Sequence, residues 1–171
     1  MTNKRKTNSV TNLKAALIDL LLEMEYSKIT IGNITQRANV SRGTFYQHFL
    51  DKDDLAYSIG TETMQRFWEI LAQGNLDKED MLLKALLLIK NDYKHFKAIS
   101  KAPHVQFKDK VQQLICDLIN SNKTIREKIK KNTKISDEIV IKAFSASFET
   151  IISFWIDNDL SESPEKVVDN I

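Results

Sequence analysis

The residues whose types and spacing could do chemistry lie in one stretch, Ser41 to Leu55, which reads SRGTFYQHFLDKDDL. Ser41 is a preferred N-cap residue, so a helix is predicted to begin at Arg42. Phe45 and Phe49 lie one turn apart on this helix and can anchor it to a core. The opposite face and its flanks carry one glycine and several hydrogen-bonding groups, namely Arg42, Gly43, Thr44, Tyr46, Gln47 and His48. Such a surface suits close approach to a polar partner.

A companion helix is predicted just upstream, from Ile31 to Val40, with Thr30 as its N-cap. Asn39 can adopt the left-handed backbone conformation that ends a helix. Two short helices joined at this point form a helix-turn-helix, whose second helix enters the major groove of DNA. We therefore expect a helix-turn-helix over residues 31–50.

The following helix is predicted to begin at Lys52, because Asp51 can cap it and Asp54 occupies its N3 position. The predicted DNA contacts come from both helices of the motif and from this helix start. They are Thr30, Ser41, Arg42, Gly43, Thr44, Tyr46, Gln47, His48 and Lys52.

The stretch ITIGNITQRANVSRGTFYQHFLDKDDL resembles the TetR (tetracycline-repressor-like) family of transcriptional regulators. The shared pattern is T-hydrophobic-x-x-I-A-x-x-A-x-V-S-x-G-x-hydrophobic-Y-x-H-F-x-x-K-x-x-L, and the resemblance extends from about Thr11 to about Leu71. Thr35 and Asn39 depart from it, because the family usually has alanine and glycine there. FWIDNDLSESPE near the C-terminus also looks like the family's usual end of its last long helix.

The resemblance implies a cytoplasmic homodimer that binds a palindromic DNA operator and, in most cases, a small-molecule effector that relieves repression. Two alternatives stay open at this point. One is an activator, or a co-regulator of the same fold that contacts another protein and does not itself bind operator DNA. The groove-reading side chains on the second helix of the motif favour DNA. The other alternative is an enzyme.

An enzyme is poorly supported, and we expect no catalytic residues, no metal and no cofactor. The three histidines, His48, His95 and His104, lack the short helical spacing and the acidic or thiol companions of a metal site. The single cysteine, Cys116, lies in an apolar setting that favours core packing.

Composition predicts an all-α protein, because four glycines and two prolines in 171 residues are too few for many short strands. The longest wholly apolar stretch, Ala85 to Ile89, is too short to span a bilayer, and the first residues lack the apolar segment of a signal peptide. We expect a cytoplasmic protein with no membrane contact. Residues 1–50 have a net charge of +4, so the remainder has −2, which places the positive excess on the helix-turn-helix segment.

Two domains are predicted: a three-helix DNA-binding domain over residues 1–50, and a helical regulatory and dimerisation domain over residues 51–171. The first helix is expected from Ser9 to Glu25, preceded by a disordered segment that serves either as a cationic arm or as a solubilising tail. A connecting helix over 52–73, stopped by Gly74 and Asn75, leads to a fifth helix capped by Asp77. Later helices are expected over 93–102, 105–120 and 136–157 and from Pro164 onward, with a solvated connection or a marginal helix between 120 and 134.

An effector pocket is predicted among the later helices, where aromatic groups accompany a few polar ones. Its expected residues are Tyr93, Phe96, His104, Phe107, Phe144 and Phe148, and a simply filled core is the alternative.

Dimerisation is predicted to use the helix over 136–157, which carries two stripes. A bulky stripe, Phe144, Phe148, Ile151 and Trp155, suits the core of the subunit. Small side chains on a second face let two backbones approach closely, so this face is assigned to the partner subunit. This second stripe comprises Ile139, Val140, Ala143, Ala146, Ser147, Thr150 and Phe154, and the expected dimer contacts are Ala143, Ala146, Ser147, Thr150 and Phe154. With the segment from Pro164 to Ile171 this face would form a four-helix bundle between subunits, and the alternative is that both stripes are buried within one subunit.

Overall fold

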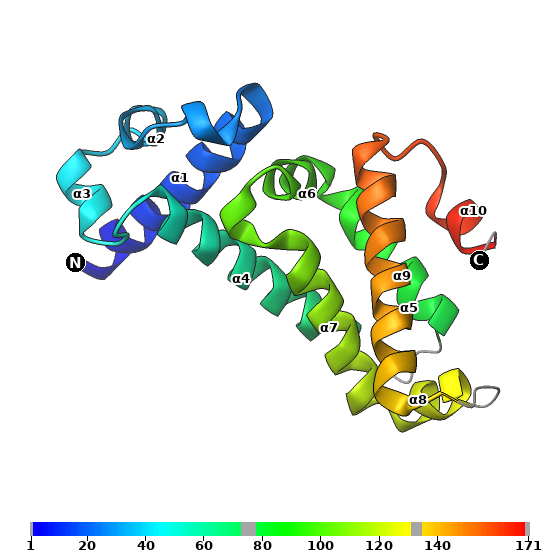
Figure 1. The fold of residues 1–171 in the computed structure, drawn as a ribbon. Helices are drawn as coiled ribbons and strands as arrows, with labels where there is room; N and C mark the ends of the chain where they lie inside the picture. Colours follow the sequence, from blue (N-terminus) through cyan, green and yellow to red (C-terminus); the bar gives the residue numbers. More distant parts are fainter. Residues whose placement is uncertain (1, 73–77, 131–134, 170–171) are drawn as a thin grey trace. The chain divides into compact units, whose positions relative to one another are not determined.

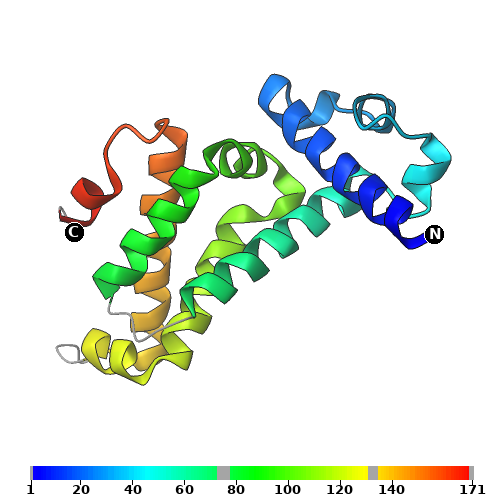
Figure 2. The ribbon, with the colours of Figure 1, turned by 180° about the vertical axis from the view of Figure 1, so that it is seen from behind.

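The computed structural model describes residues 2–72, 78–130 and 135–169, with side chains for residues 8–72, 80–129 and 135–169. Within these ranges the chain forms helices joined by turns, without a strand, which confirms the predicted all-α class (Figures 1 and 2). The elements in order are α1 (Thr2–Glu23), η1 (Tyr26–Lys28), α2 (Ile31–Arg37), α3 (Arg42–Tyr46), α4 (Lys52–Leu71), α5 (Lys78–Asn91), α6 (Tyr93–Ser100), η2 (Pro103–Val105), α7 (Phe107–Ser121), α8 (Lys123–Lys130), α9 (Asp137–Asp157) and α10 (Pro164–Asp169), where η denotes a 3₁₀ helix.

The chain divides into two compact units. Unit 1 contains Met1–Glu62 together with Lys94–Phe107, and unit 2 contains Thr63–Tyr93 together with Lys108–Ile171. Unit 1 thus contains the segment over which the DNA-binding domain is predicted, together with the start of α4 and a later segment that carries most of α6 and all of η2. Helix α4 begins in unit 1 and ends in unit 2.

The core of unit 1 forms where α1 packs on α2 and α2 packs on α3. Leu13, Leu17 and Leu21 of α1 recur at helical spacing and are buried, as the sequence pattern predicts. A salt bridge at one end joins α1 to α2, because both guanidinium Nη atoms of Arg37 bond to the carboxylate of Glu23 at 2.8 and 2.7 Å. This bidentate hydrogen bond lowers the pKa of Glu23.

Two boundaries in unit 1 differ from the predicted ones. Helix α1 begins at Thr2, so the prediction of disorder for residues 2–8 is wrong. The first helix contains no glycine or proline, and extending a formed helix by a few residues costs little. Helix α2 ends at Arg37, earlier than the predicted Val40, because the amides of Asn39 and Val40 bond to Gln36 O and Thr35 O in the turn.

The segment between α6 and α7 packs against α4 within unit 1. A Cβ atom at Gly60 would lie 2.8 Å from Val105 Cγ1 and 3.0 Å from Val105 O, so only glycine accommodates this approach. Gln106 then adopts a left-handed conformation with φ 53° and separates η2 from α7. For this reason α7 begins at Phe107, two residues after the predicted start.

Unit 2 is built on the long helix α9, whose bounds match the prediction, with α8 packed on α9 and α10 packed on α5. The predicted core stripe is only partly correct. Phe148 and Trp155 are buried, whereas Phe144 and Ile151 are half-buried. The rest of the buried face is formed by Ile141, Ser145, Ile152, Ser153 and Ile156.

Three predictions concern the segments that connect the helices of unit 2. Helix α8 occupies part of the region expected to be a connection or a marginal helix. The hydroxyl of Ser163 accepts from Lys166 N at 3.3 Å, which confirms Ser163 as the cap of α10, with Pro164 at its first position. The predicted stop at Gly74 and Asn75 and the predicted cap Asp77 lie outside the described residues.

Helix α9 is long and apolar enough to cross a membrane by length and composition, with 44% of the apolar window buried inside the subunit. A core helix meets the same criterion, and the buried face of α9 packs within unit 2. Length and composition alone therefore do not make α9 a membrane span.

Candidate nucleic-acid interface

Helix α2 is fixed at its start by a reciprocal pair of bonds between Thr30 and Asn33. The hydroxyl of Thr30 accepts from Asn33 N at 3.1 Å, and the side-chain oxygen of Asn33 accepts from Thr30 N at 3.0 Å. This arrangement is a capping box, and it confirms Thr30 as the predicted N-cap. Because the Thr30 hydroxyl also donates to Asn33 Oδ1 at 2.6 Å, this hydroxyl is engaged in the cap.

Helix α3 begins at the predicted cap. Ser41 Oγ accepts from Thr44 N at 3.0 Å and lies 2.9 Å from Thr44 Oγ1, so the two hydroxyls share a hydrogen bond. One hydroxyl hydrogen of the pair therefore stays available to an outside acceptor. A side chain at Gly43 would meet only Ser41 Oγ, at 3.6 Å, so the subunit itself does not require glycine here. The absence of a side chain instead leaves the start of α3 open to close approach.

The two phenylalanines anchor α3 as predicted, with Phe45 fully buried and Phe49 7% exposed. Their rings lie 5.9 Å apart between centroids. Tyr46 is 59% exposed and Gln47 is also exposed, whereas His48 is half-buried beside Phe49. The α-helix itself ends at Tyr46, before the predicted end, and Gln47 forms its C-cap.

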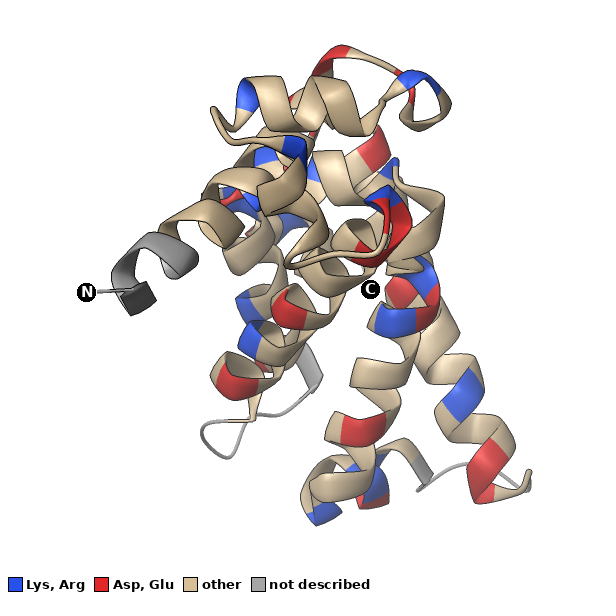
Figure 3. Cartoon of the chain, turned by 90° about the vertical axis from the view of Figure 1, so that its left-hand side faces the viewer, with Lys and Arg blue, Asp and Glu red and all other residues tan. Residues whose placement is uncertain are grey.

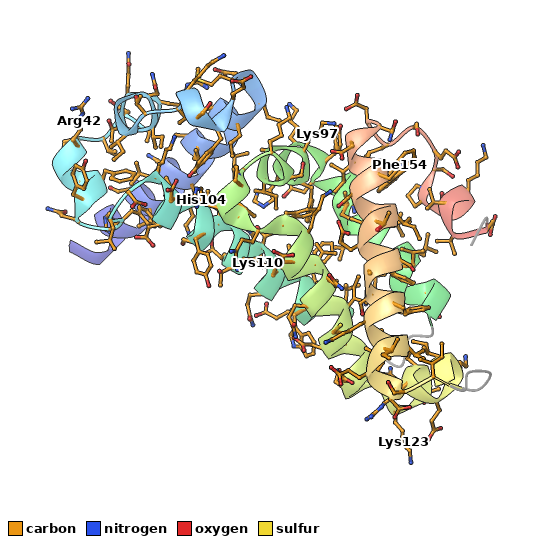
Figure 4. All side chains as sticks on the ribbon, in the orientation of Figure 1. Arg42, Lys97, His104, Lys110, Lys123 and Phe154 are labelled. Atoms are coloured by element: carbon orange, nitrogen blue, oxygen red, sulfur yellow. The ribbon has the colours of Figure 1, made fainter. Side chains whose placement is uncertain are left out.

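Arg42 is exposed at the first position of α3 and lies against α2 (Figure 4). A Cβ atom at Gly32 of α2 would lie 2.9 Å from Arg42 Nη2. Gly32 therefore provides the room that this guanidinium occupies. The sequence did not identify Gly32 as part of the site.

Asp51 and Asp54 fix the start of α4 in the predicted way. Asp54 N donates to Asp51 Oδ1 at 2.8 Å, and Asp54 Oδ2 accepts from Leu50 N at 2.9 Å. The turn that connects α3 to α4 thus has both of these amides satisfied, which holds the end of the recognition helix in place.

Lys52 has a different environment from the one expected of a phosphate contact. Its Nζ donates to the carbonyl oxygens of Tyr26 and Ile29 at 2.8 and 2.9 Å and lies 4.4 Å from the Tyr26 ring centroid. One N–H of the ammonium group remains for a phosphate. The adjacent Asp53 accepts a short hydrogen bond from the Tyr26 hydroxyl. We call the cluster of Tyr26, Lys52 and Asp53 the clasp.

The environment of the clasp raises the pKa of the Tyr26 hydroxyl. Burial, followed by the hydrogen bond to Asp53 and the negative charges of Asp53 and Asp51, raises the pKa of the Tyr26 hydroxyl well above its ordinary range. This hydroxyl therefore stays protonated and continues to donate to Asp53 at every pH used for binding assays.

Unit 1 has a net positive charge. Its sequence contains eleven Lys and Arg residues against seven Asp and Glu residues, giving +4, while unit 2 carries −2. Figure 3 shows basic and acidic residues interspersed along the helices. A net positive charge on unit 1 favours attraction of a polyanion to this part of the chain.

The predicted pocket residues are divided between the two units. Phe96, His104 and Phe107 belong to unit 1, and Tyr93, Phe144 and Phe148 belong to unit 2. Within each unit aromatic pairs form, with ring centroids 6.3 Å apart for Phe96 and Phe107 and 4.6 Å apart for Phe144 and Phe148. A cavity of about 440 Å³ in unit 2 has another lining, formed by Trp68, Leu71, Ala72, Met81, Leu118, Ser121, Asn122, Lys123, Thr124 and Ile125.

The predicted dimer face is accessible along α9. Ala143, Ser147 and Thr150 are exposed, and Ala146 is half-buried. Phe154 is 67% exposed, which is unusual for a phenylalanine in a folded subunit (Figure 4).

Two family models match this chain. Residues 13–59 match the model described as bacterial regulatory proteins, tetR family, and residues 77–171 match a TetR model described as transcriptional regulator C-terminal region. The chain belongs to the TetR family of transcriptional regulators.

Relatives and solved structures agree with this membership. The chain is 28% identical over 131 residues to the fatty acid metabolism regulator protein of Bacillus subtilis, a match that covers 77% of this chain and 63% of that protein. It is 23% identical over 170 residues to the uncharacterized HTH-type transcriptional regulator YxbF of B. subtilis, covering 95% of this chain and 43% of that protein. The chain thus spans less than two thirds of the length of these curated relatives.

Among solved structures, a TetR regulator from Streptococcus agalactiae superposes with a TM-score of 0.79 at 18% identity, covering 98% of this chain and 93% of that one. FadR from B. subtilis, solved in complex with stearoyl-CoA, superposes with a TM-score of 0.64 at 16% identity, covering 94% of both chains. These likenesses establish the TetR fold.

Sequence reasoning missed several residues of the TetR-type site. Asn33 could have been found, because Thr30-x-x-Asn33 has the spacing of a capping box. Thr35, which departs from the family pattern, is buried and donates from Oγ1 to Ile31 O at 2.9 Å, so the helix itself satisfies its hydroxyl. Tyr26 and Asp53 gave no local signal, because they meet only in the folded unit.

Proposed function

We propose that this protein is a homodimeric, cytoplasmic regulator that binds a palindromic DNA operator through α3 and represses transcription until an effector binds. The observation that carries the proposal is the exposed surface of α3. Arg42, Gly43, Tyr46 and Gln47 are exposed on a helix whose cap and buried phenylalanines fix its position. A short, rigid helix with exposed hydrogen-bonding groups at its start is what major-groove reading requires.

The residues around α3 divide into two roles. Arg42 and Gln47 carry the side chains suited to base edges, whereas Tyr46, His48 and the hydroxyls of Ser41 and Thr44 suit phosphates. Lys52 and Thr30 are engaged in the clasp and in the α2 cap, so their contribution to phosphate binding is the smaller one.

The partner subunit is proposed to pack on the α9 face formed by Ala143, Ala146, Ser147, Thr150 and Phe154. Support comes from the exposure of this face in the single subunit. A two-fold dimer presents two copies of α3 to two half-sites, and a palindromic operator mirrors that symmetry.

The effector is proposed to bind among the helices of the regulatory domain, beside the aromatic pair Phe144 and Phe148 of unit 2. The name of the B. subtilis relative and the stearoyl-CoA complex make fatty acids and acyl-CoA thioesters the first compounds to screen. Thermal-shift screening tests this part separately from DNA binding, and a screen without a stabilising compound would count against the effector.

DNA binding is tested by selecting sequences from genomic DNA and titrating the selected duplex by fluorescence anisotropy. With roughly four to six phosphates neutralised per dimer, log K should fall with log salt with a slope of about −4 to −5. Tyr46→Ala should weaken all sequences similarly, whereas Arg42→Ala or Gln47→Ala should flatten the discrimination between operators. Failure to select any sequence, or binding that does not depend on salt, would overturn the proposal.

A further inference from the structure

The clasp closes the helix-turn-helix at its two ends. Tyr26 precedes the N-cap of α2 by four residues, and Asp53 lies in the first turn of α4, directly after the recognition helix. The Tyr26–Asp53 bond and the two carbonyl bonds from Lys52 therefore join the entry of the motif to its exit. A change at the clasp therefore acts on both ends of the motif that holds α3.

A segment distant in the sequence contacts the clasp through His104. Its Nε2 lies 3.5 Å from Asp53 Oδ2, and its ring centroid lies 5.7 Å from that of Tyr26. Figure 4 labels His104 near the beginning of α4. The next residue, Val105, fills the space beside Gly60, so η2 contacts α4 at two points.

The segment that carries His104 is connected at both of its ends to unit 2. Lys94–Phe107 belongs to unit 1, whereas the chain on both sides of it belongs to unit 2. Helix α7 begins only three residues after His104, so a displacement of α7 would reach His104 through a short stretch of chain.

The surroundings of His104 are acidic. A surface hollow beside it is lined by Asp51, Asp53, Asp54 and Tyr57 of the α4 region and by Gln106 of its own segment. Tyr26 faces it from η1, and the ammonium group of Lys52 lies 4.4 Å from the Tyr26 ring centroid. Lys101 is the nearest cation before it on its own segment. A proton on His104 converts its contact with Asp53 into an ion pair.

We propose that His104 is a positioning residue for operator binding, which couples Lys94–Phe107 to the clasp through Asp53 and does so more strongly at acidic pH. The inference rests on the proposed operator binding. It assigns His104 to the control of the helix-turn-helix, a role different from the ligand pocket for which the sequence first suggested it. Because both side chains are about half exposed, the coupling is modest.

The test is a double-mutant cycle of Asp53→Asn and His104→Asn in the full chain, with operator affinity measured at pH 6 and pH 8 at one salt concentration. At pH 6 the coupling should be about 1.5- to 5-fold in Kd, the range measured for exposed ion pairs, and at pH 8 it should approach 1. Any effect of pH on the groups that contact DNA is common to all four proteins and cancels in the cycle. His95→Asn, which removes another histidine of the same segment, is the matched control and should show no coupling to Asp53.

Hydrogen exchange without DNA separates this inference from the proposed function. His104→Asn should raise amide exchange in η1 and in the first turn of α4 at pH 6. If the wild-type protein binds no operator but His104→Asn still raises this exchange, the proposed DNA binding is refuted, whereas the contact between His104 and the clasp is supported. If operator binding is normal, but neither the cycle nor exchange shows coupling at pH 6, the positioning role is refuted. His104→Gln repeats each measurement should the Asn variant prove less helical by circular dichroism.

Discussion

The α9 face can be tested with a charge at its centre. Ser147 is exposed in the single subunit, and its hydroxyl donates to Ala143 O of its own helix at 2.9 Å. Ser147→Glu therefore removes only a local bond and should leave the subunit folded. In a two-fold dimer across this face, the same substitution would place two carboxylates in the interface.

The magnitude follows from burial of these carboxylates. Removing an unpaired carboxylate from water costs several kcal/mol even after relaxation of the protein, and symmetry applies that cost twice. With one tenfold change in Kd for each 1.4 kcal/mol, a penalty of about 4 kcal/mol already weakens the dimer roughly a thousandfold. The operator affinity should fall with it, because two half-sites are no longer bound together.

Sedimentation velocity and circular dichroism together check this expectation. Ser147→Glu should give a helical monomer, while Ser147→Ala should remain dimeric. Ser147→Gln adds nearly the same volume as glutamate without the charge, so it should weaken the dimer much less. A Ser147→Glu protein that stays dimeric with unchanged stability would show that this face is not the interface.

Three further predictions concern unit 1. Ser41→Ala removes the cap of α3 and should lower the free energy of unfolding by about 1 kcal/mol in urea titrations, with a loss of operator affinity; unchanged stability would contradict the role of the cap. Gly60→Ala should destabilise the protein by about 1–2 kcal/mol, because the clash of the new methyl group with Val105 exceeds the roughly 1 kcal/mol gained in helix propensity. A variant more stable than the wild-type protein would show that η2 can move away from α4 at little cost. The pKa of Glu23 is lowered by its bond to Arg37, so the stabilisation that this pair provides is fully present above the ordinary value of 4.5 and is lost as the pH falls through the lowered pKa. Glu23→Gln should thus lower the thermal midpoint at pH 7, and the difference from the wild-type protein should shrink as the pH is lowered below 4.5.

Much of the local structure could be predicted from the sequence because its causes act over a few residues. The caps at Thr30, Ser41 and Asp51 each depend on a side chain that reaches an amide three positions ahead. The left-handed residue Asn39 follows from the small cost of that conformation for asparagine. Helical periodicity likewise predicted the buried Phe45 and the extent of α9.

Boundaries and partly buried faces were predicted less well. Helix α1 begins earlier than expected because residues with weak periodicity can extend a helix that the buried leucines stabilise. On α9 the buried face is centred nearer Ser145 and Ile152 than Phe144, since the neighbouring helices determine which side is covered.

The sequence by itself determined the helix-turn-helix, its caps and the side chains that α3 presents, because each of these depends on spacing within one or two helical turns. Only the tertiary structure decided that Lys52 bonds to the carbonyls of Tyr26 and Ile29, and that His104 contacts Asp53. Residues this far apart in the chain meet only after α1, α4 and η2 have packed around one core. The energies of these long-range contacts depend on how the helices pack, and the spacing of residues along the chain does not specify that packing.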